Sequence, residues 1–320
     1  MYPLLFNQNI FNLVWGSENW IVSAVPDKES TVANGSLNGA TLGQLVYECG
    51  VNLMGKKVVD MYGNQFPLLI KFIDAKQDLS IQVHPNDELA MQRHGSFGKT
   101  EMWFVIDAEP GAKLYSGFNQ AITKYEYQKR VEDGSICEVL QSHSVKKGDV
   151  FFIPAGRIHA ICGGIYLAEV QQSSDITYRI FDYKRPGLDG RMRQLHTELA
   201  VDAIDYRLYP TYKTRYIEKT NKPVGITQCP YFTVKIHNIT RAFHRKLFKY
   251  DSFIIYICLE GDCVVSMRDR TLEVTGIELK QGQSCLVPAS VANLDLIPNN
   301  DAGVARLLEV YIDNRHFNQM

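Results

Sequence analysis

The chain has 320 residues, 45% of them hydrophobic and 22% charged, a composition typical of globular proteins with room for about two domains. Its 34 basic and 35 acidic residues give a formal net charge of −1, which excludes a basic field that attracts nucleic acid or an anionic membrane. No apolar run is long enough to span a bilayer, and the first residues do not form a signal peptide. Seven cysteines without a Cys-x-x-Cys pair favour a reducing compartment, so we expect a cytoplasmic protein.

The first two thirds of the chain predict short strands with a few helices between them. A capping box at Thr41 and Gln44 predicts a helix over 42–49, which Gly50 ends. Asn86 is expected to cap a second short helix that runs through Arg93. A third helix is expected over 197–204. Hydrophobic runs and alternation predict strands at 67–72, 79–84, 103–106, 112–115, 150–153, 165–171 and 177–181.

A repeat indicates that a β unit is duplicated. Residues 148–155 and 282–289 share a glycine, five further residues and then Pro-Ala. A turn glycine, an apolar strand and a proline that ends the ladder explain this spacing. A polar, tyrosine-rich linker begins at about residue 206, and only short strands are expected after it. We therefore expect a mainly β protein of two barrels: a first domain over 1–220, which includes short helices and the linker, and a second over 221–320.

Four side chains form a candidate metal site in the first domain. Gln82 and His84 lie two apart on one predicted strand and so share a face. Glu101 enters a later strand, and His159 follows Pro154, where the chain turns back. Two imidazoles, one carboxylate and an amide oxygen around an open position suit a catalytic Zn²⁺, although these ligand types also suit Fe²⁺ or Mn²⁺.

The surrounding residues resemble the motifs of the cupin superfamily. Residues 148–159 resemble the second cupin motif, Gly-x5-Pro-x-Gly-x2-His, with Gly163 in place of the closing asparagine. The first motif, usually His-x-His followed closely by Glu, is present only as Gln82-x-His84 with a long insertion before Glu101. This resemblance implies two cupin, jelly-roll-like β-barrels with a few short helices packed on the first.

Longer strings resemble, in order and spacing, the type I mannose-6-phosphate isomerases in their short bacterial form. The resemblance covers about residues 10 to 195 and is weaker across the second half. The opening Trp15-Gly-Ser-Glu-Asn-Trp20 belongs to it as well. The strings lie at 66–75, 80–87 (Ser-Ile-Gln-Val-His-Pro-Asn-Asp), 98–103 (Gly-Lys-Thr-Glu-Met-Trp), 153–160 and 171–182.

The resemblance implies an aldose–ketose isomerase that interconverts mannose 6-phosphate and fructose 6-phosphate through an enediol, with one Zn²⁺ per chain. The catalytic arginine of the family falls on Arg179, and its lysine near the substrate falls on Lys99. Asn293 stands at the place of His159 in the repeat, so the second domain is expected to hold no metal. The implied metal ligands are Gln82, His84, Glu101 and His159.

Two other interpretations remain open at the level of the sequence. One is another metal-dependent cupin enzyme, such as an iron dioxygenase, because two histidines and a glutamate also suit Fe²⁺. Lys99 and Arg179 favour an anionic substrate instead. The other is a non-catalytic cupin that binds a sugar phosphate without turning it over.

Overall fold

The computed structural model describes residues 1–268 and 274–313, which fall into two compact units. The first unit contains residues 10–20 and 68–214, and the second contains 1–9, 21–67 and the chain from 215 onward. Two segments expected in an amino-terminal domain, 1–9 and 21–67, thus belong by their contacts to the second unit. Independent folding of 1–220 and 221–320 stays a prediction.

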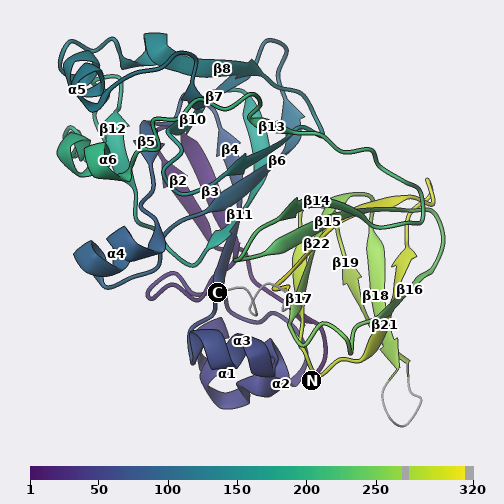
Figure 1. Cartoon of the computed structure of the whole chain (residues 1–320). Coiled ribbons are helices and arrows are strands. Elements are labelled where there is room, and N and C mark those ends of the chain that lie inside the picture. The colour runs from purple at the N-terminus through teal and green to yellow at the C-terminus, as the bar shows by residue number, and fades with distance from the viewer. Residues whose placement is uncertain (269–273, 314–320) are drawn as a thin grey trace. The chain divides into compact units, whose positions relative to one another are not determined.

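Two sheets pack face to face in the first unit (Figure 1). Trp103 and Phe151 from one sheet meet Leu114 and Ile161 from the other, and this apolar layer is the core of the unit. The larger sheet has the order β13 (Lys213–Thr214), β9 (Val150–Ile153), β6 (Glu101–Ala108), β11 (Ile165–Gln172), β4 (Leu68–Ala75), β3 (Gly16–Val22) and β2 (Ile10–Leu13). The smaller sheet has the order β12 (Tyr178–Phe181), β5 (Ile81–Val83), β10 (His159–Ile161), β7 (Lys113–Phe118) and β8 (Leu140–Ser144).

Short helices cover the outer face of the smaller sheet. Tyr127 and Ala200 from two of them pack against Ile81, Val83 and Ala160 of the sheet. These elements are α5 (Lys124–Glu132), η2 (Ile136–Val139) and α6 (Thr197–Ala203), and α4 (Asp87–His94) follows β5. The prediction missed α5, because it is a polar helix with a single buried side chain and has little apolar periodicity. A capping box at its first turn starts it instead.

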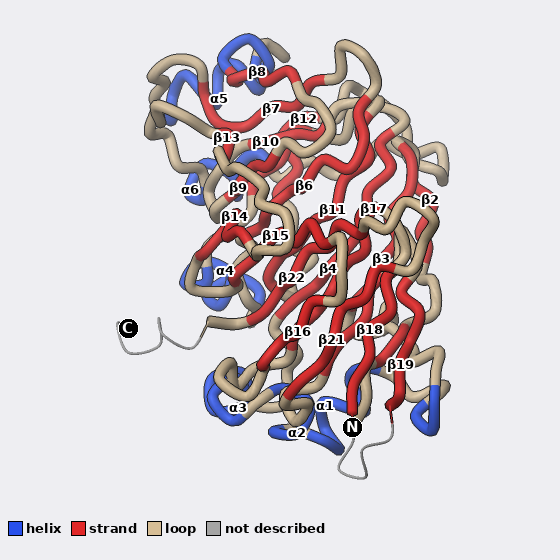
Figure 2. Tube along the Cα trace, turned by 90° about the vertical axis from the view of Figure 1, so that its right-hand side faces the viewer, coloured by secondary structure: helices blue, strands red, loops and turns tan. Residues whose placement is uncertain are grey.

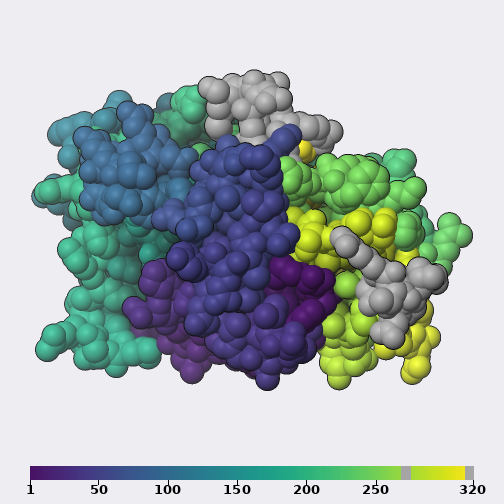
Figure 3. All heavy atoms as spheres, turned by 90° about the horizontal axis from the view of Figure 1, so that it is seen from below, coloured from purple at the N-terminus to yellow at the C-terminus, as the bar shows by residue number. Residues whose placement is uncertain are grey.

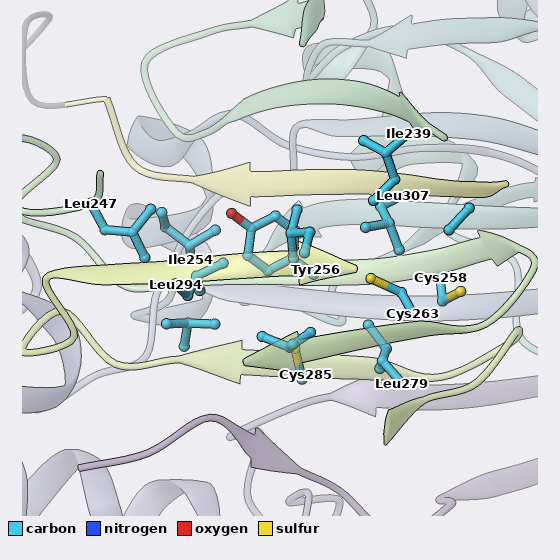
Figure 4. Packing of buried hydrophobic residues seen from close by; sticks show 14 of the residues in the cluster. Ile239, Leu247, Ile254, Tyr256, Cys258, Cys263, Leu279, Cys285, Leu294 and Leu307 are labelled. Atoms are coloured by element: carbon cyan, nitrogen blue, oxygen red, sulfur yellow. The ribbon is translucent and has the colours of Figure 1, made fainter. Parts of the chain in front are cut away.

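The second unit repeats this architecture. Its apolar core lies between two sheets, as Figure 4 shows. One sheet has the order β1 (Leu4–Leu5), β20 (Ser284–Val287), β17 (Ile254–Glu260), β22 (Ala305–Tyr311), β15 (Thr233–Ile239) and β14 (Val224–Gln228). The other has the order β16 (Phe243–Lys246), β21 (Asn293–Pro298), β18 (Cys263–Arg268) and β19 (Val274–Leu279). The helical elements of the unit are η1 (Gly35–Leu37), α1 (Leu42–Cys49), α2 (Val51–Met54) and α3 (Lys56–Tyr62).

The predicted helix over 42–49 is confirmed as α1, including the reciprocal bonds between Thr41 and Gln44. The surface of α1–α3 is visible in Figure 3 in dark blue-violet. Strands outnumber helices throughout the described chain, as Figure 2 shows in red. In the described ranges, no helix is long and apolar enough to cross a membrane. All seven cysteines are free thiols.

The duplication is confirmed by strand order. The series β9-β6-β11-β4 corresponds to β20-β17-β22-β15, and β5-β10-β7-β8 corresponds to β16-β21-β18-β19. The pairings among the described strands leave each unit as an open two-sheet sandwich. The expected mainly β, jelly-roll-like fold is therefore present, whereas closed barrels are not formed by these pairings.

A tight backbone approach at Gly16 predicts a large stability effect. Its φ is +146°, and a Cβ there would lie 1.9 Å from the carbonyl oxygen of Asp74. Gly111 also has a positive φ, +84°, but a Cβ there meets no atom within 4 Å. Gly111→Ala should cost about 1 kcal/mol from backbone strain alone. Gly16→Ala should lower the free energy of unfolding by at least about 2 kcal/mol more than Gly111→Ala does, because of the clash with Asp74. Urea denaturation of both variants checks this, and equal costs would contradict it.

Candidate metal centre

Strand register brings the predicted ligands onto the inner faces of the two sheets. Gln82 on β5 lies directly opposite His159 on β10. Glu101 shares its strand face with Trp103, and His159 shares its face with Ile161. Because Trp103 and Ile161 both belong to the core between the sheets, these side chains point into the sandwich.

Three of the four expected ligands form one buried cluster. The Nε2 atom of His84 lies 3.5 Å from Oε2 of Glu101, and Nε2 of His159 lies 3.4 Å from Oε1. One potential ligand atom from each residue lies within 4.8 Å of the others. All three side chains are at most 1% exposed. The described chain holds no other group of three histidine, cysteine or acidic side chains that fits a metal ion.

Backbone carbonyls orient both imidazoles. Nδ1 of His84 lies 2.9 Å from the carbonyl oxygen of Ile176, and Nδ1 of His159 lies 2.7 Å from that of Arg157. A carbonyl only accepts, so each Nδ1 carries the proton and each Nε2 presents its lone pair to Glu101. Nε2 of His84 and Oε1 of Glu101 lack a hydrogen-bond partner, and Oε2 of Glu101 contacts the ammonium of Lys99. A divalent cation would satisfy these buried acceptors, and the donor set fits one.

The electrostatics of the cluster favour the protonation states that a metal requires. Burial lowers the pKa of His84 to about 3, and it lowers the pKa of His159 as well. Burial would raise the pKa of Glu101, but the ammonium of Lys99 holds that pKa well below its usual value. Nζ of Lys99 lies 3.1 Å from Oε2 of Glu101. The centre therefore contains two neutral imidazoles and an ionised carboxylate at neutral pH.

Gln82 and Arg179 lie at the half-exposed side of the cluster. Nε2 of Gln82 lies 3.2 Å from Nε2 of His159, and rotation of the amide by half a turn would present its oxygen instead. Arg179 on β12 is paired with Gln82 on β5, so the two side chains share a face. Both side chains are only partly buried, whereas His84 is buried, so the cluster is least buried on this side.

Arg179 and the nearby Asp182 do not form an ion pair with each other, and each has other partners. The carboxylate of Asp182 pairs with Arg185 and Arg193. Arg179 donates one bond through Nη1 to the carbonyl oxygen of Gln194, at 2.9 Å, and its buried Nε has no hydrogen-bond partner. The guanidinium thus retains donors for an anionic group.

The sequence analysis missed a charged network behind the cluster. Nζ of Lys71 lies 3.5 Å from Oε2 of Glu18 and 3.4 Å from Oε1 of Glu169. Nε1 of Trp103 donates to Oε2 of Glu169 at 2.9 Å. Lys71 and Glu169 each interrupt an apolar run within a strand, a signal that could have identified them, since buried charges are rarely unpaired.

The second unit cannot form the same ligand set. Ile254 corresponds to Glu101 by strand register. Glu101 lies opposite Ile153, and Ile254 lies opposite Val287, and each of these partners directly precedes the repeated Pro-Ala. Figure 4 shows Ile254 among apolar side chains. Asn293 takes the place of His159, and Lys246, which lies opposite Asn293, takes the place of Gln82.

Two family models match the chain. Residues 15–103 match the catalytic domain of type I phosphomannose isomerase, and residues 225–300 match the cupin domain of mannose-6-phosphate isomerase. Mannose-6-phosphate isomerase ManA of Bacillus subtilis is 36% identical over 279 residues, which are 81% of this chain and 86% of that protein. The probable mannose-6-phosphate isomerase GmuF of the same organism is 43% identical over 188 residues, 58% of each chain.

A solved structure is similar over nearly the whole chain. The crystal structure of the mannose 6-phosphate isomerase from Bacillus subtilis has a TM-score of 0.83 at 28% identity, and the match covers 97% of this chain and 99% of that one. The similarity therefore includes both units, not the ligand cluster alone.

The buried histidines predict an acid-sensitive fold in metal-free protein. The folded protein holds His84 neutral because its pKa is lowered to about 3, whereas the unfolded chain takes up a proton below about 6.5. Stability conferred by the neutral ring is therefore lost as the pH falls from 7 to 5, by about 2 kcal/mol for His84. Urea denaturation of chelator-treated protein at each pH measures this loss. Between pH 7 and pH 5, the free energy of unfolding of His84→Gln should fall by about 2 kcal/mol less than that of the wild type. Identical pH slopes for wild type and variant would contradict this.

Proposed function

Because the chain belongs to the type I mannose-6-phosphate isomerase family, we propose that it interconverts mannose 6-phosphate and fructose 6-phosphate at the His84–Glu101–His159 cluster with one bound Zn²⁺. The observation that carries this is the buried cluster of two imidazoles and one carboxylate, in which Nε2 of His84 and Oε1 of Glu101 have no hydrogen-bond partner. The proposal places the enzyme in mannose and carbohydrate metabolism, in the cytoplasm, with a small sugar phosphate as its partner rather than nucleic acid or membrane.

The proposed metal ligands are Gln82, His84, Glu101 and His159. The two imidazoles are pre-oriented by backbone carbonyls, so little reorganisation is needed for metal binding. Three neutral ligands and one carboxylate would leave a site of net positive charge. When bound, Zn²⁺ supplies a Lewis acid that polarises the oxygens at carbons 1 and 2 of the sugar.

Arg179 and Lys99 are proposed to act on the substrate. The reaction moves a proton between carbons 1 and 2 through an enediol, whose oxygens gain negative charge in the transition state. Arg179 would donate hydrogen bonds to these oxygens or to the phosphate, since its planar fork stays charged and suits either group. One well-placed donor is worth about 3–4 kcal/mol of barrier. Lys99, held by Glu101, would assist in opening the ring or meet the phosphate dianion.

Membership of the isomerase family favours this function over the two alternatives. An iron dioxygenase would contain stoichiometric iron after purification without added metal and would consume oxygen. A non-catalytic binder would be stabilised against heat by mannose 6-phosphate but would form no fructose 6-phosphate. A coupled isomerisation assay together with metal analysis separates all three functions.

Removal of one imidazole should abolish both metal binding and activity. His84→Ala is expected to lose the metal and nearly all turnover, because the remaining ligands are too few for a tight site. Chelation of the wild type should have the same effect on turnover, and added Zn²⁺ should reverse it. His244→Ala is the matched control, since this exposed histidine pairs with Asp295 in the second unit. Retention of metal and turnover in His84→Ala would remove this cluster from the proposal.

Loss of the arginine should affect turnover but not the metal. Arg179→Ala is expected to retain bound metal and to lower kcat at least about tenfold, because one charged donor to the transition state is lost. Arg191→Ala, an exposed arginine in the following loop, should leave kcat unchanged. Steady-state kinetics with metal analysis measures both effects. An unchanged kcat in Arg179→Ala would assign this side chain a structural role.

A further inference from the structure

We propose that Lys71, Glu169 and Trp103 form a positioning triad that holds His159 in place and thereby sets the metal affinity of the centre. This inference rests on the metal site proposed above. None of the three residues is proposed to bind the metal or the substrate. They act through the packing of the Trp103 ring against His159.

The triad is one row of the larger sheet. Glu169 on β11 lies directly opposite Lys71 on β4 and directly opposite Trp103 on β6. Three adjacent strands therefore place the ammonium, the carboxylate and the indole side by side on the inner face. All three side chains are at most about 5% exposed. A carboxylate so deeply buried requires both neighbours, because an unpaired buried charge is strongly unfavourable.

The indole links this row to the ligand cluster. Its Nε1 donates to Glu169 at one edge, so the ring cannot turn without breaking a buried hydrogen bond. The ring packs edge-to-face on His159, with centroids 5.2 Å apart and an interplanar angle of 76°. His159 is thus held by the carbonyl oxygen of Arg157 through Nδ1 and by Trp103 through its ring. Nε2 is left directed at Glu101.

The second unit contains the same row without a metal cluster beside it. Glu309 on β22 lies opposite Lys235 on β15 and opposite Tyr256 on β17, in the register of Glu169, Lys71 and Trp103. The Tyr256 hydroxyl donates to Oε2 of Glu309 at 3.0 Å, as the indole does to Glu169. Figure 4 shows Tyr256 within the apolar core of that unit. Asn293 takes the place of His159 there, so this row has no imidazole ligand to position.

The two rows differ in how completely their carboxylates are satisfied. Glu309 also contacts His237 at 3.1 Å and Arg245 at 2.6 Å, so it keeps partners when Tyr256 is changed. Oε1 of Glu169 has only the ammonium of Lys71, at 3.4 Å, and Oε2 accepts the indole bond. Loss of that bond should therefore disturb the first row more than the second, and only the first row lies against a ligand.

The test measures Zn²⁺ affinity in metal-free full-length protein by competition with a chromophoric chelator. Trp103→Phe removes the indole donor, and Glu169→Ala removes its acceptor. Each should raise the Kd for Zn²⁺ about tenfold, the size typical of residues that orient metal ligands. Glu169→Gln keeps an oxygen that accepts the indole bond but loses the charge that pairs with Lys71, so its Kd should lie between those of wild type and Glu169→Ala. Tyr256→Phe, the matched change in the second unit, should lower the melting temperature without changing the Kd.

Unchanged Kd values in Trp103→Phe and Glu169→Ala would overturn the triad, whatever their effect on melting temperature. An equal rise in Kd for Tyr256→Phe would also overturn it, since metal affinity would then follow overall stability. A wild-type protein that binds no Zn²⁺ would overturn the proposed centre and the triad with it. The proposed centre survives the first two results, so the two failures are distinguishable.

Discussion

The rest of the first unit depends on one constraint. An ionised carboxylate is buried without solvent exposure between two imidazoles that burial keeps neutral. Glu101 remains ionised there because the ammonium of Lys99 lies against it. Such an arrangement is costly to bury unless its acceptors are satisfied. The fold sets it up through strand register, since β5, β10 and β6 each present one face to the core. A divalent cation is the partner that the remaining lone pairs fit.

The duplication separates what the fold requires from what the site requires. Both units keep the same strand order, and both keep a lysine–glutamate–aromatic row in the same register. Among the described residues, only the first unit has a carboxylate and two imidazoles near that row. In the second unit Ile254 extends the apolar core at the corresponding position. The proposed activity therefore depends on a few side chains placed on a repeated frame, not on the frame itself.

Local sequence signals were most reliable where one short-range interaction decides the outcome. The capping box at Thr41 identified α1 with its bounds, and the repeated Gly-x5-Pro-Ala string located β9 and β20. The polar helix α5 was missed, because its existence depends on one buried tyrosine and on the sheet beneath it. The contacts of 21–67 with the second unit follow from no local pattern, since none records which sheet a helix will pack on.

The sequence alone determined the family, the mainly β class, the duplicated unit and the names of the four candidate ligands, because motif spacing and strand alternation are local properties of the chain. Only the tertiary structure decided that Gln82 stands opposite His159, that Arg179 shares their face, and that Lys71, Glu169 and Trp103 lie in one row behind them. Each of these pairs is far apart in the chain, and their contact depends on register between strands. Register is set by the packing of the whole inner face, so no single segment carries it.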